Sequence, residues 1–362
     1  MKKRYRILSF LAVVLIGAGA ALWWFLRPLP VLTVTTWAGD YGRAQASALM
    51  RPYAAEKSVD VRLAQWDGDL AEVARAVRTH QYTGDVIDFE LPKAVEACRH
   101  GLLEKIDPTI LPPGRDGTLP ARDFVMGAIG PCYVGNVVYS QVMIAASGLA
   151  RTPATVADFF DTDTFPGRRV LLGASAKFNL EMALLADGVA ARDVYKTLAT
   201  PQGQARAFAK LKALNPIWAQ DSVDAIAKVQ SGQAVMATAL NGAVFDAAQK
   251  GFHPTVLWDH QLYEMDVFAI PAGNPNRKRA QAFIAYATAS QPLARMANWV
   301  PYGPARRSAL AFVTANPETG QAMRQWLPTA PANFTTAFAI DDGWWLDHGN
   351  ALESRWQGFI HP

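Results

Sequence analysis

The chain is poor in the residues that build covalent scaffolds, metal centres and familiar catalytic sites. Its 362 residues include only two cysteines and six histidines, which excludes a disulfide-dense miniprotein and a multi-zinc domain. His253 and His260 lack the spacing of metal ligands, so we predict no metal site. No GxSxG, SxxK, HExxH or GxxxxGK motif occurs. We therefore expect a protein that is not an enzyme, with no catalytic residue and no cofactor.

Positive charge is scarce outside the first 27 residues. The formal net charge of the chain is +4. Five basic residues and no acid lie within the leader, so the rest of the chain has a slight excess of acidic groups. A broad basic face, the electrostatic footprint of a nucleic-acid-binding protein, is therefore not expected.

The N-terminus has the pattern of an export segment. A cationic start is followed by an uncharged run from Ile7 to Leu26, which is long enough to span a bilayer. Trp23 and Trp24 before Arg27 are typical of a membrane interface, whereas the small residues of 17–21 are typical of a cleavage site. A cleaved signal peptide and an uncleaved anchor helix remain alternatives. Either one places residues 28 onward outside the cytoplasm.

The two cysteines, Cys98 and Cys132, would then lie in an oxidising compartment. Two thiols there can form a single disulfide, and we predict this bridge. The alternative is two separate buried thiols.

Short β-branched runs alternate with helical patterns after the leader. Strands are predicted over 31–36, 59–63, 85–88, 169–172, 217–219, 234–238, 255–257 and 267–270. Helices are predicted between them, including one long helix over 275–289. This alternation indicates an α/β chain with mainly parallel sheets, in which ligands bind beyond the carboxyl ends of strands. No long linker occurs, so two closely packed lobes are expected.

Six stretches, in a fixed order over residues 31–358, carry a family likeness. They are Thr36–Gly42, Gly101–Asp107, Phe159–Arg168, Met265–Pro271, Val300–Pro304 and the tryptophan-rich tail Trp344–Trp356. Together they resemble the spermidine/putrescine-binding family of periplasmic solute-binding proteins, which serve ABC importers.

The resemblance implies a two-lobed, type II binding-protein clamshell that closes over one small solute. Residues 31–134 plus 264–304 would form lobe 1, and residues 135–263 plus 305–362 would form lobe 2. The protein would act as a periplasmic monomer, and an inner-membrane ABC permease would be its partner. A membrane-tethered sensor that uses the same closure and, thirdly, a hydrolase remain rival functions.

The resemblance also implies a ligand site with an aromatic wall at Trp37 and an acid for an ammonium group at Asp266. Leu240 and Glu264 stand where polyamine binders place tryptophans, and Lys177 adds a cation. These departures favour a solute with both an amine and an acid, amino-acid-like or opine-like. Asp266 would pair with its amine and Lys177 with its carboxylate.

The complete set of expected ligand-binding residues follows from these matches and from polar residues at strand ends. It comprises Trp37, Asp40, Tyr41, Asp88, Asn136, Lys177, Asn179, Ser222, Asn241, Glu264, Asp266 and Tyr302. Asp40, Asp88 and Ser222 are equally good helix caps.

Overall fold

The architecture is known from a computed structural model that describes residues 28–361. The export segment predicted at 7–26 lies outside the described residues, as does the choice between cleavage and anchoring. Among the helices of residues 28–361, none combines the length and the hydrophobicity needed to cross a membrane.

A single ten-stranded sheet runs through the protein in the order β2-β1-β3-β8-β4-β7-β5-β6, with β9 paired to β4 and β10 to β8. The strands are β1 (Val31–Thr36), β2 (Asp60–Gln65), β3 (Val86–Glu90), β4 (Tyr133–Ala145), β5 (Arg169–Leu172), β6 (Ile217–Ala219), β7 (Met236–Leu240), β8 (Thr255–Ala269), β9 (Gly303–Pro304) and β10 (Phe338–Ala339). Strand pairs near each end are parallel, as predicted. The central pairs β3–β8, β8–β4 and β4–β7 are antiparallel.

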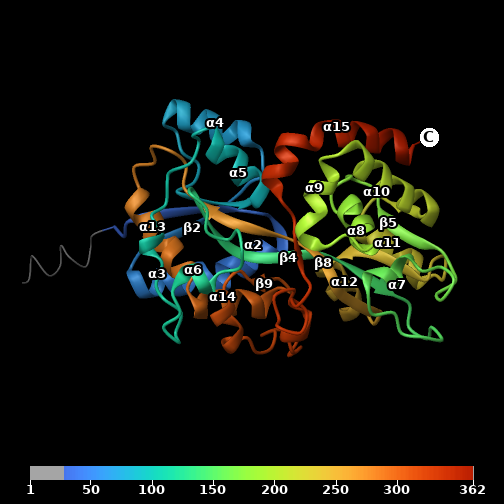
Figure 1. Cartoon of the computed structure of the whole chain (residues 1–362). Coiled ribbons are helices and arrows are strands. Elements are labelled where there is room, and N and C mark those ends of the chain that lie inside the picture. The colour runs from blue at the N-terminus through green and yellow to red at the C-terminus, as the bar shows by residue number, and fades with distance from the viewer. Residues whose placement is uncertain (1–27, 362) are drawn as a thin grey trace, which may run out of the picture.

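The long strands β4 and β8 pass from one half of the molecule to the other (Figure 1). The sequence predicted only the two ends of β8, and it predicted no strand for β4. Polar residues such as Gln261 and Glu264 interrupt the apolar pattern of β8 at the junction between the lobes. Because these side chains are buried there in hydrogen bonds, the strand continues where its composition indicates a break.

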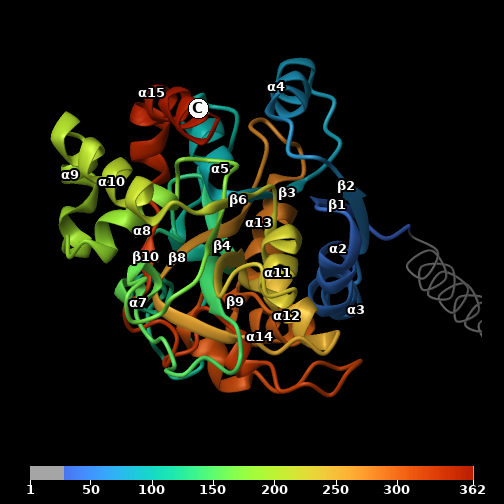
Figure 2. The same cartoon turned by 90° about the vertical axis from the view of Figure 1, so that its right-hand side faces the viewer.

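Helices cover both faces of the sheet (Figures 1 and 2). The helices used below are α2 (Gly39–Gln45), α5 (Leu91–Arg99), α8 (Asn179–Ala186), α11 (Ser222–Gln230), α12 (Asn241–Gln249), α13 (Arg277–Ala287), α14 (Ser290–Trp299) and α15 (Asp342–Ile360). The helix predicted over 275–289 ends at Ala287, and α14 follows it as a separate helix. In Figure 2, α15 lies beside α5, and the two helices contact each other.

Each lobe has its own hydrophobic core, which confirms the expected two-lobed fold. Phe89 and Phe283 lie in the core of the first lobe, whereas Phe159 and Trp356 lie in that of the second. Residues 307–312 and Leu327, assigned to lobe 2 from the sequence, pack instead against α14 in the first lobe. The buried guanidinium of Arg306 holds this segment against the first lobe, because its carboxylate partner, Asp123, belongs to that lobe.

Cys98 of α5 and Cys132, just before β4, form the predicted disulfide. The bond joins the helix that follows β3 to the first of the long crossing strands. It therefore constrains the chain at the point where it leaves the first lobe.

Candidate functional site

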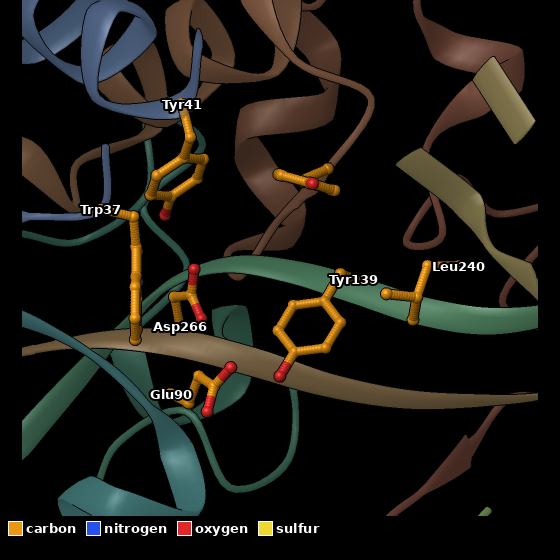
Figure 3. A pocket seen from close by; sticks show the side chains of 7 residues that line it. Trp37, Tyr41, Glu90, Tyr139, Leu240 and Asp266 are labelled. Carbon is orange, nitrogen blue, oxygen red and sulfur yellow. The ribbon is translucent and has the colours of Figure 1, made fainter. Parts of the chain in front are cut away.

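A cavity of about 230 Å³ lies between the two lobes (Figure 3). It is lined by Trp37, Tyr41, Glu90, Tyr139, Leu240, Asp266 and Tyr302. Trp37, Glu90 and Leu240 lie at the carboxyl ends of β1, β3 and β7, while Tyr139 and Asp266 project from the crossing strands. The cavity therefore occupies the place where an α/β sheet ordinarily binds its ligand.

Trp37 forms one wall and is held in place by its neighbours. Its ring lies 5.8 Å from that of Trp66, and the Trp66 indole donates to the carbonyl of Asp88. Gly68, with φ of +85°, approaches the Trp37 ring so closely that a Cβ atom there would lie 2.9 Å from it. A side chain at position 68 would thus strain the backbone and displace the tryptophan.

Two carboxylates project side by side into the cavity. Glu90 of β3 and Asp266 of β8 are directly opposite each other in the antiparallel ladder, so both side chains lie on the same face. Burial, followed by the nearby carboxylate of Glu264, raises the pKa of Glu90. Burial also raises the pKa of Asp266 well above its usual value, and repulsion from Asp88 and Glu90 adds to the shift. The two groups thus disfavour each other's ionised form, and a cation placed between them would stabilise both carboxylates.

Asp88 and Asn136 lie behind the cavity wall and support it. Asp88 is buried and accepts hydrogen bonds from Gln45 Nε2 at 2.5 Å and Thr36 Oγ1 at 3.1 Å. Burial raises the pKa of Asp88 to about 7. Asn136 Nδ2 donates to the Tyr41 hydroxyl at 3.2 Å, which orients that ring in the cavity.

On the second-lobe side, Asn241 and Ser222 bind backbone groups. Asn241 Oδ1 accepts from the Ser140 amide at 3.0 Å, and its Nδ2 donates to the Pro301 carbonyl at 2.6 Å. Ser222 Oγ accepts from the Leu240 amide at 2.9 Å. These two residues position the start of α12 and the chain leading to Tyr302.

The side chain of Asn179 also hydrogen-bonds to backbone groups of the protein. Its Nδ2 donates to the carbonyls of Leu172 and Ser175, both at 2.8 Å. It therefore stabilises the turn between β5 and α8 and does not line the cavity.

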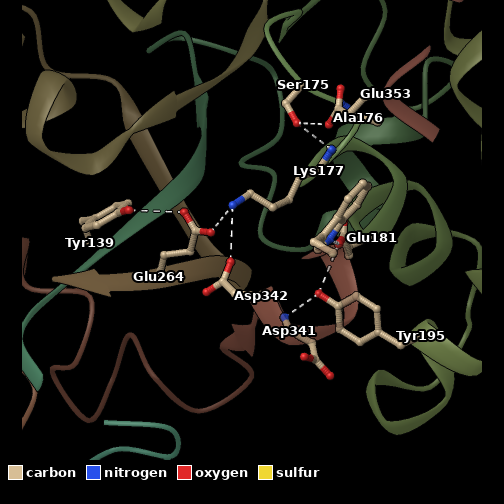
Figure 4. A network of polar contacts seen from close by, with 11 residues as sticks. Tyr139, Ser175, Ala176, Lys177, Glu181, Tyr195, Glu264, Asp341, Asp342 and Glu353 are labelled. Atoms are coloured by element: carbon tan, nitrogen blue, oxygen red, sulfur yellow. Dashed lines mark hydrogen bonds and ion pairs between the residues drawn. The ribbon is translucent and has the colours of Figure 1, made fainter. Parts of the chain in front are cut away.

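Lys177 lies in a polar cluster next to the cavity (Figure 4). Its ammonium group donates to Glu264 and, at 3.4 Å, to Asp342 Oδ1. The other oxygen of Glu264 accepts from the Tyr139 hydroxyl at 3.2 Å. Burial lowers the pKa of Lys177, but the two acids outweigh this effect and raise it overall. Lys177 is therefore a charged group with internal partners.

Asp40 does not reach the cavity. Its side chain is 82% exposed in the first turn of α2, where it pairs with Arg43. It is not the N-cap of that helix either, because Ala38 takes that position.

Four of the residues expected from the sequence line the cavity: Trp37, Tyr41, Asp266 and Tyr302. Glu90, Tyr139 and Leu240 also line it, although the expected ligand set did not include them. Glu90 precedes a helix and has the pattern of a cap, and Tyr139 lies in the strand that the sequence did not predict. The alternation of side chains along β4 would have indicated Tyr139 had that strand been recognised.

Residues 48–323 match the family described as bacterial extracellular solute-binding protein. The chain is 38% identical over 331 residues to a gamma-aminobutyric acid-binding protein of Pseudomonas aeruginosa, and the match covers 91% of this chain and 90% of the relative. These similarities extend across both lobes and the cavity between them.

Solved structures share the fold. The Atu4243-GABA receptor superposes with a TM-score of 0.73 at 27% identity, covering 91% of this chain and 97% of the receptor. The binding protein MotA of A. tumefaciens B6, in complex with glucopine, superposes with a TM-score of 0.69 at 25% identity, covering 91% of this chain and 99% of MotA. The two-lobed binding-protein architecture is thereby confirmed.

Proposed function

Because the chain belongs to the family of bacterial extracellular solute-binding proteins, we propose that it captures a small amino-acid-like solute with an amine, such as gamma-aminobutyric acid, for an ABC importer. The sequence favoured such a solute over a simple diamine. Two of the similar proteins described above are named for gamma-aminobutyric acid and a third is in complex with glucopine, which supports that preference.

The observation that carries the proposal is the Glu90–Asp266 pair. Like charges directly opposite each other on a sheet destabilise it unless a proton or a cation compensates them. An ammonium group between the two carboxylates would relieve their repulsion and form charge-assisted hydrogen bonds. No lysine, arginine or histidine is among the residues that line the cavity, so the solute would supply this cation.

The aromatic residues suit the same ligand. Trp37, Tyr41, Tyr139 and Tyr302 surround the acids, and the rings of Tyr41 and Tyr302 are 5.8 Å apart. Aromatic faces attract a cation and pack against a short alkyl chain. The small volume of the cavity also favours a solute smaller than a typical drug, for which cavities measure about 300–1,000 Å³.

The opposite end of the cavity favours an anion. Leu240 lies across the cavity from the acids in Figure 3, and α12 begins at the next residue. A Cβ atom on Gly242 would lie only 2.9 Å from the Tyr302 hydroxyl, so that hydroxyl lies over the first turn of α12. We assign the carboxylate of the solute to this end, because helix N-termini and hydroxyl donors stabilise negative charge. Lys177, expected from the sequence to bind this carboxylate, already has two internal partners.

Capture would shift the lobes toward the closed state. The solute would contact Glu90 of the first lobe and Leu240 of the second together, so its additional contacts stabilise closure. The closed monomer would then dock on an inner-membrane permease in the periplasm, either free or tethered through residues 7–26. A tethered sensor would use the same closure and differ only in its partner.

Isothermal titration with three matched compounds tests this function. Gamma-aminobutyric acid carries both charged ends, butyric acid lacks the amine, and putrescine carries a second amine in place of the carboxylate. We expect selective binding of gamma-aminobutyric acid or a close ω-amino acid. Equal binding of butyric acid, or no binding by any ω-amino acid, would contradict the proposal.

A further inference from the structure

Three carboxylates form an acidic strip, Glu264 and Asp266 on the crossing strand β8 and Glu90 on the neighbouring strand β3. Glu264 and Asp266 are alternate residues of this strand, so they point to the same face about 7 Å apart. Tyr139 lies opposite Glu264, and Glu90 lies opposite Asp266. The acidic strip therefore continues past Asp266 to Glu264, which lies just beyond the residues that line the cavity.

Glu264 differs from the other two acids because it already has a cation. The Lys177 ammonium lies between Glu264 and Asp342, whose side chains are only 6% and 2% exposed. The Tyr139 hydroxyl donates a hydrogen bond to the other carboxylate oxygen of Glu264. Lys177 itself is 18% exposed, so its charge is shielded from bulk water. It is linked to the cavity through Glu264 and the lining residue Tyr139.

The spacing of the strip has a consequence for diamines. A diamine with four methylene groups separates its two nitrogens by about the distance between alternate residues of a strand. With one ammonium on Glu90 and Asp266, the other would reach Glu264. Lys177 neutralises that carboxylate and repels a second cation in a region of low dielectric.

We infer that Lys177 is a specificity-determining residue that excludes α,ω-diamines by pairing with Glu264, the carboxylate that would bind their second ammonium group. The inference rests on the proposed function, because it assumes that the first ammonium binds Glu90 and Asp266. The Lys177–Glu264–Asp342 cluster would thus discriminate between an amino acid and a diamine of similar length. Rejection of a wrong ligand by a like charge is a common source of specificity.

The test compares putrescine and gamma-aminobutyric acid in Lys177→Met, which keeps the length of the side chain and removes its charge. We expect the ratio of the association constants, putrescine over gamma-aminobutyric acid, to rise at least about tenfold, through an increase in the putrescine constant. Adding Glu264→Gln to this variant should remove the increase in putrescine affinity. Lys177→Arg should not increase putrescine affinity, because it retains the charge.

Lys228→Met is the matched control, since Lys228 also pairs with an aspartate but lies on α11 away from the lining residues. Thermal unfolding verifies that each variant is folded, and Lys177→Gln, which retains a hydrogen-bond donor, replaces Lys177→Met if that variant is not. An unchanged ratio in the neutral variants, or a gain that survives Glu264→Gln, would overturn the inference. If wild-type protein binds no ω-amino acid while the neutral variants still gain putrescine binding, the proposed solute is wrong and the role of Lys177 is retained.

Discussion

Replacement of Asp266 by asparagine should weaken capture of an amine-bearing solute without disrupting the cavity. The side chain keeps its shape, but the buried position loses its charge. Truncating one partner of a buried, hydrogen-bonded charge pair costs about 2–5 kcal/mol. Glu90 lies directly across the ladder and still faces the ammonium group, so we expect the lower part of this range. About 2–3 kcal/mol corresponds to a loss of about 30- to 150-fold in affinity.

The pH dependence gives a second, independent readout. Burial and the neighbouring acids raise the pKa of Asp266 in the free protein, and a bound ammonium group would lower it again. Binding should therefore release a proton, and wild-type affinity should rise with pH until Asp266 is ionised in the free protein. In Asp266→Asn the contribution of this residue disappears, and a shallower dependence due to Glu90 remains.

Calorimetric titrations with gamma-aminobutyric acid over a range of pH, in buffers of different ionisation enthalpy, measure both quantities. Asp40→Asn is the matched control, because Asp40 is an exposed aspartate outside the cavity. We expect Asp40→Asn to bind like the wild type. Unchanged affinity in Asp266→Asn, or wild-type affinity that falls as pH rises, would refute the assignment of the ammonium site.

Three further predictions concern the wall of the cavity and the stability of the lobes. Trp37→Ala should weaken amine binding by about 1–2 kcal/mol, measured by calorimetry, through loss of cation–π and packing contacts; unchanged binding would remove Trp37 from the site. Replacing Cys98 and Cys132 by serine should lower the free energy of unfolding by about 4 kcal/mol, because the bond closes a loop of sequence separation 34; denaturant titration would show this. Asp123→Asn should cost about 3–5 kcal/mol, since it leaves the buried Arg306 guanidinium without its carboxylate. Adding Arg306→Met should recover part of this loss, and no recovery would contradict the pairing.

Local patterns were sufficient for most of the elements in the outer parts of the sheet. The strands predicted over 31–36 and 169–172 depend on neighbours in sequence, and both occur in the structure as β1 and β5. Strands β4 and β8 could not be predicted in the same way. Their polar residues are satisfied by partners far along the chain, such as Gln261 with Pro328 and Asn333. Prediction from short sequence windows therefore does not recover the full length of the strands that connect the lobes.

The sequence by itself determined the α/β class, the disulfide pair, the family likeness and four residues that line the cavity, Trp37, Tyr41, Asp266 and Tyr302. These follow from composition, strand-end positions and short motifs, which do not depend on the register of distant strands. Only the tertiary structure decided that Glu90 lies beside Asp266 and that the Lys177 ammonium group pairs with Glu264 and Asp342. The physical reason is that the environment of a buried charge is set by partners that pairing and lobe packing bring together, and those partners are remote in sequence.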